Sequence, residues 1–214
     1  MAAKYKVIGT PVRKVDGMSK CLGVDQFADD IFLPRMIYAK IHRSPVAHAK
    51  IKSIDTSKAE AMPGVFAVLT GEEMPIPFGI LPISQDEHAL CPDKVRFIGD
   101  EVAAVAADTE DAAEEALSLI RVNYEPLSAV FDPKEAVQDE APLVHEGKAR
   151  NICMEFHKMF GDPEKGFAEA DHIVEDSYDT QRVAHCPLET RSLIARWERT
   201  GHDSRLKIWA STQA

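Results

Sequence analysis

The stretch Val102-Ala103-Ala104-Val105-Ala106-Ala107 decides the fold of this chain. A short run of small and β-branched apolar residues predicts a buried strand. Asp108 or Thr109 can cap a helix that follows it as far as Ile120, and acidic residues in the first turn complement the positive end of the helix dipole. The inward face of that helix is expected to consist of Ala113, Ala116, Leu117 and Ile120. Residues 121–125 then form a second strand, closed by Pro126, so this part of the chain is a strand, helix, strand unit.

The residues before this unit also alternate between strand and helix patterns. Residues 36–41 and 49–54 read as two strands that pair as a hairpin across the Ser44-Pro45 turn signal. Asp55 or Thr56 can cap a short helix through Ala61, and residues 65–70 are a run typical of a buried strand. Residues 1–35 are predicted to be irregular. Residues 72–92, rich in Pro and Gly, are predicted to be a long ordered loop.

The residues after the unit are looser. Residues 128–150 are expected to be extended, and a helix over residues 164–170 precedes three strand candidates, which are residues 173–180, 192–198 and 206–210. The last strand pattern runs into Ser211 and the end of the sequence without polar punctuation. We therefore expect the front part of a larger protein, whose remaining residues form a longer chain or a separate subunit.

Composition excludes several classes of partner. The 214 residues carry a formal net charge of -10. A surface that binds nucleic acid or an anionic membrane requires clustered Lys and Arg, so we expect neither partner. No apolar run approaches the roughly 20 residues that span a bilayer, and no signal peptide is visible, so we expect a cytoplasmic protein. The four cysteines are far apart, which favours reduced thiols over a disulfide framework.

Two pairs of residues raise the question of a metal site. Cys153 and His157 have helical i, i+4 spacing, but two ligands do not make a zinc site. His185 and Cys186 are neighbours, so on a strand their side chains point to opposite faces. Ordinary packing is the simpler interpretation of both pairs.

Three further polar groups are candidates for function. His42, Arg43 and His48 surround the Ser44-Pro45 turn and can bind an anion or supply a base, although such residues more often satisfy backbone groups. The pair Asp100-Glu101 is most simply solvated at a turn. Residues 181–191 combine amide, imidazole, thiol, carboxylate and guanidinium groups, which permits either a polar loop or a functional segment.

Several motifs, in order along essentially the whole chain, resemble the molybdenum-binding large subunit of the xanthine dehydrogenase and aldehyde oxidase family. They are Gly9-x-Pro11-x-Arg13-x-x-Asp16-Gly17-x-x-Lys20, Arg43-Ser44-Pro45-Val46-Ala47-His48-Ala49, Met62-Pro63-Gly64-Val65, Lys94-Val95-Arg96-Phe97-Ile98-Gly99-Asp100-Glu101 with residues 102–107, Val122-Asn123-Tyr124-Glu125-Pro126-Leu127, His185-x-x-Leu188-Glu189 and Ser211-Thr212-Gln213. Within the family, residues 79–83 and 86–90 look most like the alpha subunit of 4-hydroxybenzoyl-CoA reductase.

The resemblance implies an α+β protein with an α/β-hammerhead domain followed by the start of a molybdopterin-binding domain. The expected parts are an N-terminal arm at residues 1–19, the hammerhead at 20–130, a linker at 131–150 and the incomplete cofactor-binding domain at 151–214. In the family, the glutamine matched by Gln213 donates a hydrogen bond to an oxo ligand of molybdenum, which a neutral carboxamide can do without becoming a ligand. His185 and Glu189 match family positions, and no catalytic role is transferred to them.

The resemblance also implies cofactors and partners. The complete enzyme is expected to use molybdopterin with molybdenum, together with iron-sulfur clusters and FAD on an iron-sulfur subunit and a FAD subunit, in a hetero-oligomer. No cofactor is expected on these 214 residues alone, which lack the glycine-rich cofactor loop of the family. The substrate is expected to be a small aromatic such as 4-hydroxybenzoyl-CoA, which is dehydroxylated reductively. Alternatives are hydroxylation of an aldehyde or N-heterocycle, and a non-catalytic assembly or interaction module.

Overall fold

The computed structural model describes residues 6–79, 85–187, 189–201 and 203–212. Contacts divide the chain into two units, one of residues 35–176 and one that combines Met1–Pro34 with Ser177–Ala214. None of the helices in the described ranges is long and apolar enough to cross a membrane.

The predicted strand, helix, strand unit is confirmed and lies at the centre of residues 35–176. It consists of β7 (Glu101–Ala107), α3 (Glu110–Leu119) and β8 (Arg121–Pro126). Thr109 is the residue that caps α3, and its hydroxyl accepts a hydrogen bond of 3.1 Å from the amide of Ala112. The helix buries Ala113 and Ala116, as its apolar spacing predicts.

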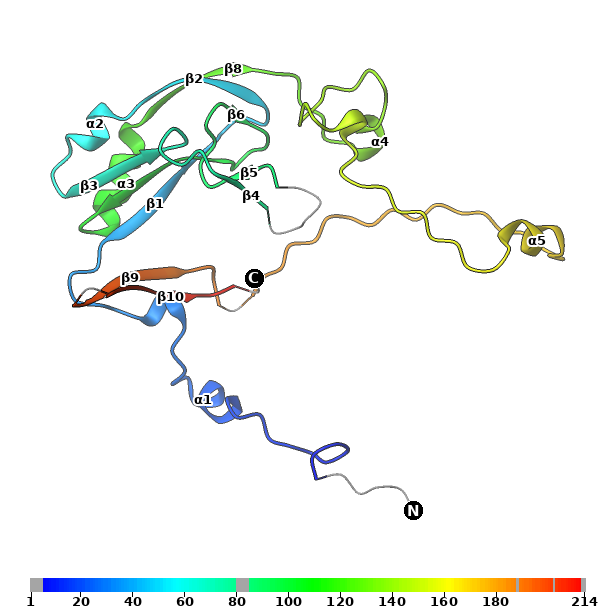
Figure 1. Cartoon of the computed structure of the whole chain (residues 1–214), viewed down its shortest axis with the longest axis horizontal. Helices are drawn as coiled ribbons and strands as arrows, with labels where there is room; N and C mark the ends of the chain where they lie inside the picture. The colour runs from blue at the N-terminus through cyan, green and yellow to red at the C-terminus, as the bar shows by residue number, and fades with distance from the viewer. Residues whose placement is uncertain (1–5, 80–84, 188, 202, 213–214) are drawn as a thin grey trace. The chain divides into compact units, whose positions relative to one another are not determined.

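The strands β7 and β8 each belong to a three-stranded antiparallel sheet of residues 35–176. In one sheet β7 lies between β1 (Tyr38–Arg43) and β3 (Val65–Thr70), and α3 covers it on one face. In the other, β2 (Ala49–Asp55) lies between β6 (Lys94–Val95) and β8. Figure 1 labels the outer strands β1 and β3 of the first sheet and β2, β6 and β8 of the second.

The predicted hairpin of residues 36–41 with residues 49–54 is wrong, because the two strands belong to different sheets. Instead of a hairpin turn, Ser44 exchanges backbone hydrogen bonds with the Gly99-Asp100 turn. The Ser44 amide donates to the Asp100 carbonyl, and the Gly99 amide donates to the Ser44 carbonyl, both at 2.8 Å. These bonds direct β1 onto β7, where an antiparallel ladder replaces the expected one.

The core of the unit has two clusters, one on each side of β7. Ala59, Ala103, Val105, Ala116 and Ile120 pack together under α3 and the short helix α2 (Ser57–Glu60). The second cluster is built from Ala49, Cys91, Val95 and Val102. The buried run predicted at residues 65–70 is only half buried, since Phe66 is 66% exposed. β3 therefore buries one face only.

Several short elements differ from the expected loops. Residues 1–35 contain the helix α1 (Gly17–Leu22) and a 3-10 turn (Ala28–Asp30). The loop at 72–92 contains β4 (Pro77–Phe78) and β5 (Glu87–His88). Residues 128–150 are less extended than expected, with α4 (Pro133–Ala136) and the start of a 3-10 turn (Ala149–Asn151). The predicted helix near residue 164 is confirmed as α5 (Pro163–Ala168), capped by Asp162.

The second unit contains an antiparallel pair of strands, β9 (Leu193–Thr200) and β10 (Asp203–Ala210). These confirm two of the three strand candidates near the end of the chain. The third candidate, residues 173–180, is not a strand. Its apolar residues Val174 and Tyr178 are 90% and 86% exposed, and an alternating pattern makes a strand only where another strand pairs with it.

Replacement of Gly71 by alanine is expected to destabilise the fold. An alanine Cβ would lie 2.5 Å from the backbone carbonyl of Cys91 and the Cα of Pro92, and backbone cannot rotate away as a side chain can. We expect Gly71→Ala to lower the free energy of unfolding by about 2 kcal/mol or more. Urea denaturation measures this free energy. Gly147→Ala is the control, because among the described residues no atom other than those of Gly147 and its chain neighbours lies within 4 Å of the added Cβ. Equal stability of the two variants would contradict this expectation.

Candidate functional site

The end of β10 is fixed by the hydroxyl of Ser211. This oxygen accepts a hydrogen bond of 2.8 Å from the Ser192 amide and donates one of 2.9 Å to the Thr190 carbonyl. The Ser211 amide donates in turn to the Ser192 carbonyl at 3.1 Å. These bonds continue the β9–β10 ladder beyond its last pair, Leu193 with Ala210. We call Ser211, Ser192 and Thr190 the strand-end clamp.

The predicted site residue, Gln213, lies outside the described residues, so its role stays a prediction. The clamp fixes the backbone two residues before it. A short tether of this kind restricts where the next side chains can reach, since each residue spans at most about 3.6 Å. In the sequence Ser211 is only one member of a family motif, and nothing about its residue type indicates this role.

The segment of residues 181–191 is exposed over most of its described length. His185 and Cys186 do not meet in a shared site, and Cys186 is an exposed free thiol. Glu189 has a partner: its carboxylate accepts a hydrogen bond of 3.4 Å from the amide of Ala28. This contact joins the segment to the 3-10 turn at Ala28–Asp30, so Glu189 has a structural role in this unit.

The side chains of Cys153 and His157 are both exposed. Cys153 is an exposed free thiol, and the His157 ring lies 3.2 Å from the carboxylate of Glu155. No cluster of three or more His, Cys, Asp or Glu side chains able to hold a metal ion occurs in the part of the chain that the structure describes.

The group around the Ser44-Pro45 turn serves the backbone, as the simpler interpretation predicts. The Nδ1 of the buried His48 lies 2.7 Å from the Ser128 carbonyl, and its Nε2 has no hydrogen-bond partner among the described residues. Arg43 donates to the Gly99 carbonyl at 2.8 Å and pairs with Glu101. His42, a residue of β1, is half buried, and this desolvation lowers its pKa despite a hydrogen bond to the backbone of Leu117 in α3.

Asp100 corrects the prediction of a solvated acidic pair. It is only 8% exposed, and its carboxylate accepts a hydrogen bond of 2.8 Å from the Arg96 amide. This bond closes the turn that contains Gly99, whose φ is +98°. Burial, and next the bond to Asp100, raise the pKa of the neighbouring Cys91 thiol, so this cysteine stays protonated and unreactive.

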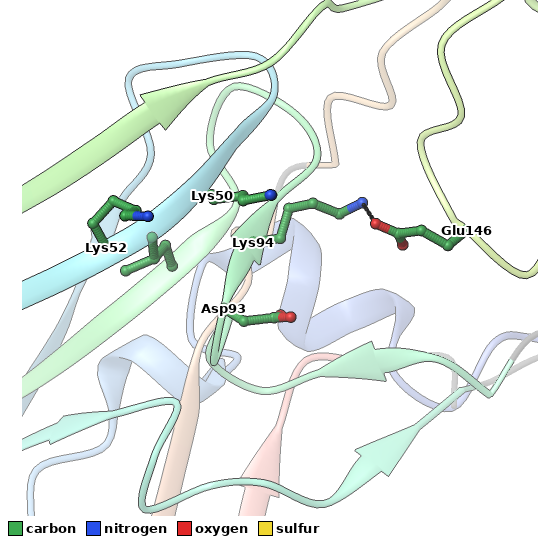
Figure 2. A pocket seen from close by; sticks show the side chains of 6 residues that line it. Lys50, Lys52, Asp93, Lys94 and Glu146 are labelled. Carbon is green, nitrogen blue, oxygen red and sulfur yellow. Dashed lines mark hydrogen bonds and ion pairs between the residues drawn. The ribbon is translucent and has the colours of Figure 1, made fainter.

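A shallow cavity of about 320 Å³ lies beside β2 and β6 (Figure 2). Its lining is Lys50, Ile51, Lys52, Asp93, Lys94 and Glu146. The Lys94 side chain is 5% exposed, whereas that of Glu146 is 75% exposed. The Lys94 ammonium donates to the Glu146 carboxylate at 2.6 Å and to the Val144 carbonyl at 3.0 Å. The hydrogen bond from Lys94 lowers the pKa of Glu146 to about 2.

The chain matches two family models in order. Residues 22–128 match the a/b hammerhead domain of aldehyde oxidase and xanthine dehydrogenase. Residues 144–214 match the molybdopterin cofactor-binding domain. The cavity beside Lys94 is formed by elements of the first match together with Glu146, which belongs to the second.

Curated relatives are similar over the whole chain. It is 39% identical to the nicotinate dehydrogenase large molybdopterin subunit of Eubacterium barkeri, over 100% of this chain and 49% of that protein. It is also 39% identical to a probable xanthine dehydrogenase subunit of Bacillus subtilis, over 97% of this chain and 27% of that protein. The chain therefore spans about half the length of the first relative and about a quarter of the second.

Solved structures agree with the sequence relatives. Quinoline 2-oxidoreductase from Pseudomonas putida 86 matches with a TM-score of 0.85 and 32% identity, over 98% of this chain and 27% of that one. The aldehyde oxidoreductase from Desulfovibrio gigas matches with a TM-score of 0.76 and 28% identity, over 91% of this chain and 22% of that one. The expected hammerhead followed by the start of a cofactor-binding domain is confirmed.

Loss of the Ser211 hydroxyl is expected to loosen the strand-end clamp. Ser211→Ala leaves the Ser192 amide and the Thr190 carbonyl without this partner, at a cost of about 1 kcal/mol. Hydrogen exchange of the Ser192 amide is the measurement, and it should become several-fold faster. Ser204→Ala, a change of the same kind at an exposed position of β10, is the control. Unchanged exchange in Ser211→Ala would show that the clamp is not a stabilising contact.

Protonation of His42 is expected to lower the free energy of unfolding as the pH falls. Its pKa is lowered in the folded state from 6.5 by burial, so on acidification the unfolded state takes up the proton first. The contribution of neutral His42 to the free energy of unfolding is fully present above pH 6.5. It is lost as the pH falls through the lower pKa of the folded state. Urea unfolding between about pH 7.5 and pH 5 should show a shallower loss of stability in His42→Gln than in the unsubstituted chain. Parallel pH profiles of the two proteins would refute a buried neutral His42.

Proposed function

The chain belongs to the aldehyde oxidase and xanthine dehydrogenase family, and from this membership we propose that it is the front part of the molybdenum subunit of a molybdenum hydroxylase-type oxidoreductase. The observation that carries the proposal is the order of the two matches, a hammerhead domain and then a molybdopterin cofactor-binding domain, on one continuous chain. Relatives named as molybdopterin or xanthine dehydrogenase subunits support it.

The role proposed for this chain at the metal is to hold one hydrogen-bond donor in place. Bound molybdopterin would supply the redox chemistry at molybdenum. Gln213 would donate its carboxamide N–H to an oxo ligand of the metal, which fixes that ligand without adding charge. The strand-end clamp supports this role, because Ser211 holds the backbone two residues before Gln213. The remaining cofactor contacts would come from residues of the complete subunit beyond these 214.

We propose an aromatic N-heterocycle as the substrate class. Three of the relatives act, by their names, on nicotinate, xanthine and quinoline, each of which is a nitrogen heterocycle. Hydroxylation of such a ring is an oxidation, and its electrons would leave through iron-sulfur clusters and FAD on partner subunits in a hetero-oligomer. An aldehyde is the second candidate, favoured by the match to an aldehyde oxidoreductase.

Reductive dehydroxylation of 4-hydroxybenzoyl-CoA is a third candidate substrate reaction. It rests on the likeness of residues 79–83 and 86–90 to the alpha subunit of that reductase. Residues 80–84 lie outside the described residues, so the structure adds no geometry to this candidate. None of the four relatives compared with the chain is named for that reaction.

Purification from the native source with accompanying subunits tests the function. We expect a complex that contains molybdenum, iron and flavin and that oxidises nicotinate or quinoline in the presence of an artificial electron acceptor. Benzaldehyde and 4-hydroxybenzoyl-CoA, the latter with a reductant, are assayed beside them to separate the three substrate classes. A complex without molybdenum would overturn the proposal, and activity on the thioester alone would replace the heterocycle.

In that complex, Gln213→Ala is expected to lower kcat about 10–100-fold, the usual effect of removing a group that orients a metal ligand. Molybdenum content should stay close to that of the unsubstituted enzyme, because the amide is not a ligand. Gln26→Ala removes an exposed glutamine with no described hydrogen bond and serves as the control. Unchanged kcat in Gln213→Ala would remove this residue from the site.

A further inference from the structure

Lys94 and Glu146 form an unequal ion pair. The lysine is buried on β6, while its carboxylate partner is mostly exposed on a loop 52 residues further along the chain. A buried ammonium without partners is costly, whereas an exposed carboxylate loses little when it returns to water. The pair therefore fastens residues 143–151 to β6 from the buried side, and the Val144 carbonyl adds a second contact to the same ammonium.

Asn151 fastens the other end of this segment. Its side-chain amide donates to the Ala136 carbonyl at 2.9 Å and to the Pro142 carbonyl at 3.1 Å. Its side-chain oxygen accepts a hydrogen bond of 2.9 Å from the Val144 amide. One side chain thus joins both ends of the loop to α4.

The backbone between these fastenings is strained. Arg150 and Asn151 both have a φ of +55°, the left-handed region that residues other than glycine and asparagine avoid. Arg150 is held there by a hydrogen bond of 2.7 Å from its Nε to the Val137 carbonyl. Backbone strain of this kind persists only where surrounding contacts over-determine it, and it clusters at active sites, ligand clamps and switch regions.

We propose that residues 143–151 form a latch, which opens as one unit while the two sheets and α3 stay folded. Lys94 and Asn151 hold the latch closed, and the strained backbone at Arg150 favours opening. A contact between His145 and Asp86, at 3.0 Å, is a third fastening. Because the latch lies where the hammerhead match has ended and the cofactor-binding match begins, its opening would lengthen the free chain between these two regions. The latch itself depends only on these contacts and not on the proposed function.

Hydrogen exchange and limited trypsin digestion of the full chain, purified with the subunits that accompany it, test the latch. Lys94→Met removes the buried ammonium, and Asn151→Gly removes the side-chain fastening while it tolerates the positive φ. In both variants we expect exchange of the backbone amides at positions 144, 148 and 151 and trypsin cleavage after Lys148 to rise about tenfold. Amides of β7 and α3 should keep their protection.

Lys52→Met is the matched control, because it removes the same charge from the neighbouring strand β2. There Lys52 pairs with Glu125 at 2.9 Å. This variant should leave the amides of the latch protected from exchange. Unchanged exchange at Val144 in both test variants would overturn the proposal. So would an increase that is equal in the latch and in β7, because the segment would then unfold only with the whole unit.

The unsubstituted chain gives a second test that does not depend on the variants folding. In native-state exchange at low urea, latch amides should open with a smaller urea dependence than those of β7, since a local opening exposes less surface. The same urea dependence in both regions, or latch amides that exchange as fast as an unfolded peptide, would contradict a closed latch.

Discussion

The close packing of α3 on β7 through alanine side chains is the constraint on which the unit of residues 35–176 depends. Ala103 on the strand and Ala113 and Ala116 on the helix are all fully buried. Side chains this small let the helix backbone approach the strand closely, and interiors packed to crystal-like density leave no room for larger ones. The helix α3 covers one face of β7, and β1 and β3 pair with its two edges, so β7 is the central strand of its sheet. The position of β1 in turn places Ser44 beside the Gly99-Asp100 turn, where they exchange backbone hydrogen bonds. The chain then enters β2 of the second sheet.

Sequence reasoning succeeded where the signal is local. The cap at Thr109, the inward alanines of α3 and the short helix α5 all depend on residues within a few positions of each other, and the sequence pattern contains that information. The β1–β2 hairpin was wrong because an alternating pattern specifies the face of a strand and not its partner. The prediction of a strand at residues 173–180 was wrong for a related reason. A strand needs a paired neighbour, and the alternating pattern of one segment does not show whether it has one.

The candidate site shows the same limit. A family likeness selected Gln213, but the role of Ser211 depends on the register of β9 against β10, which brings residues 190, 192 and 211 together. Likewise, the Lys94–Glu146 pair joins a residue of the hammerhead match to a residue of the cofactor-binding match, and no spacing in the sequence indicates it. Asp100 was predicted to be solvated, but its carboxylate accepts a hydrogen bond from a backbone amide. A sequence pattern does not indicate which backbone amide lies near a side chain.

The hydrogen bonds of the strand-end clamp are important because the β9–β10 pair has little other stabilisation. Two-stranded hairpins are marginally stable in water, and on one face of this pair Leu193, Trp197, Leu206 and Ile208 are 65%, 66%, 43% and 53% exposed. Apolar burial therefore contributes little to holding these strands in register, and hydrogen bonds at the ends of the ladder carry more of that role. Frayed strand ends would spread the following residues over many positions. A donor that must meet a metal oxo group, as proposed for Gln213, loses its effect when it moves by about 1 Å. The Ser211 hydroxyl, which bonds to both an amide and a carbonyl of the facing chain, limits that fraying at the point where the proposed chemistry requires it.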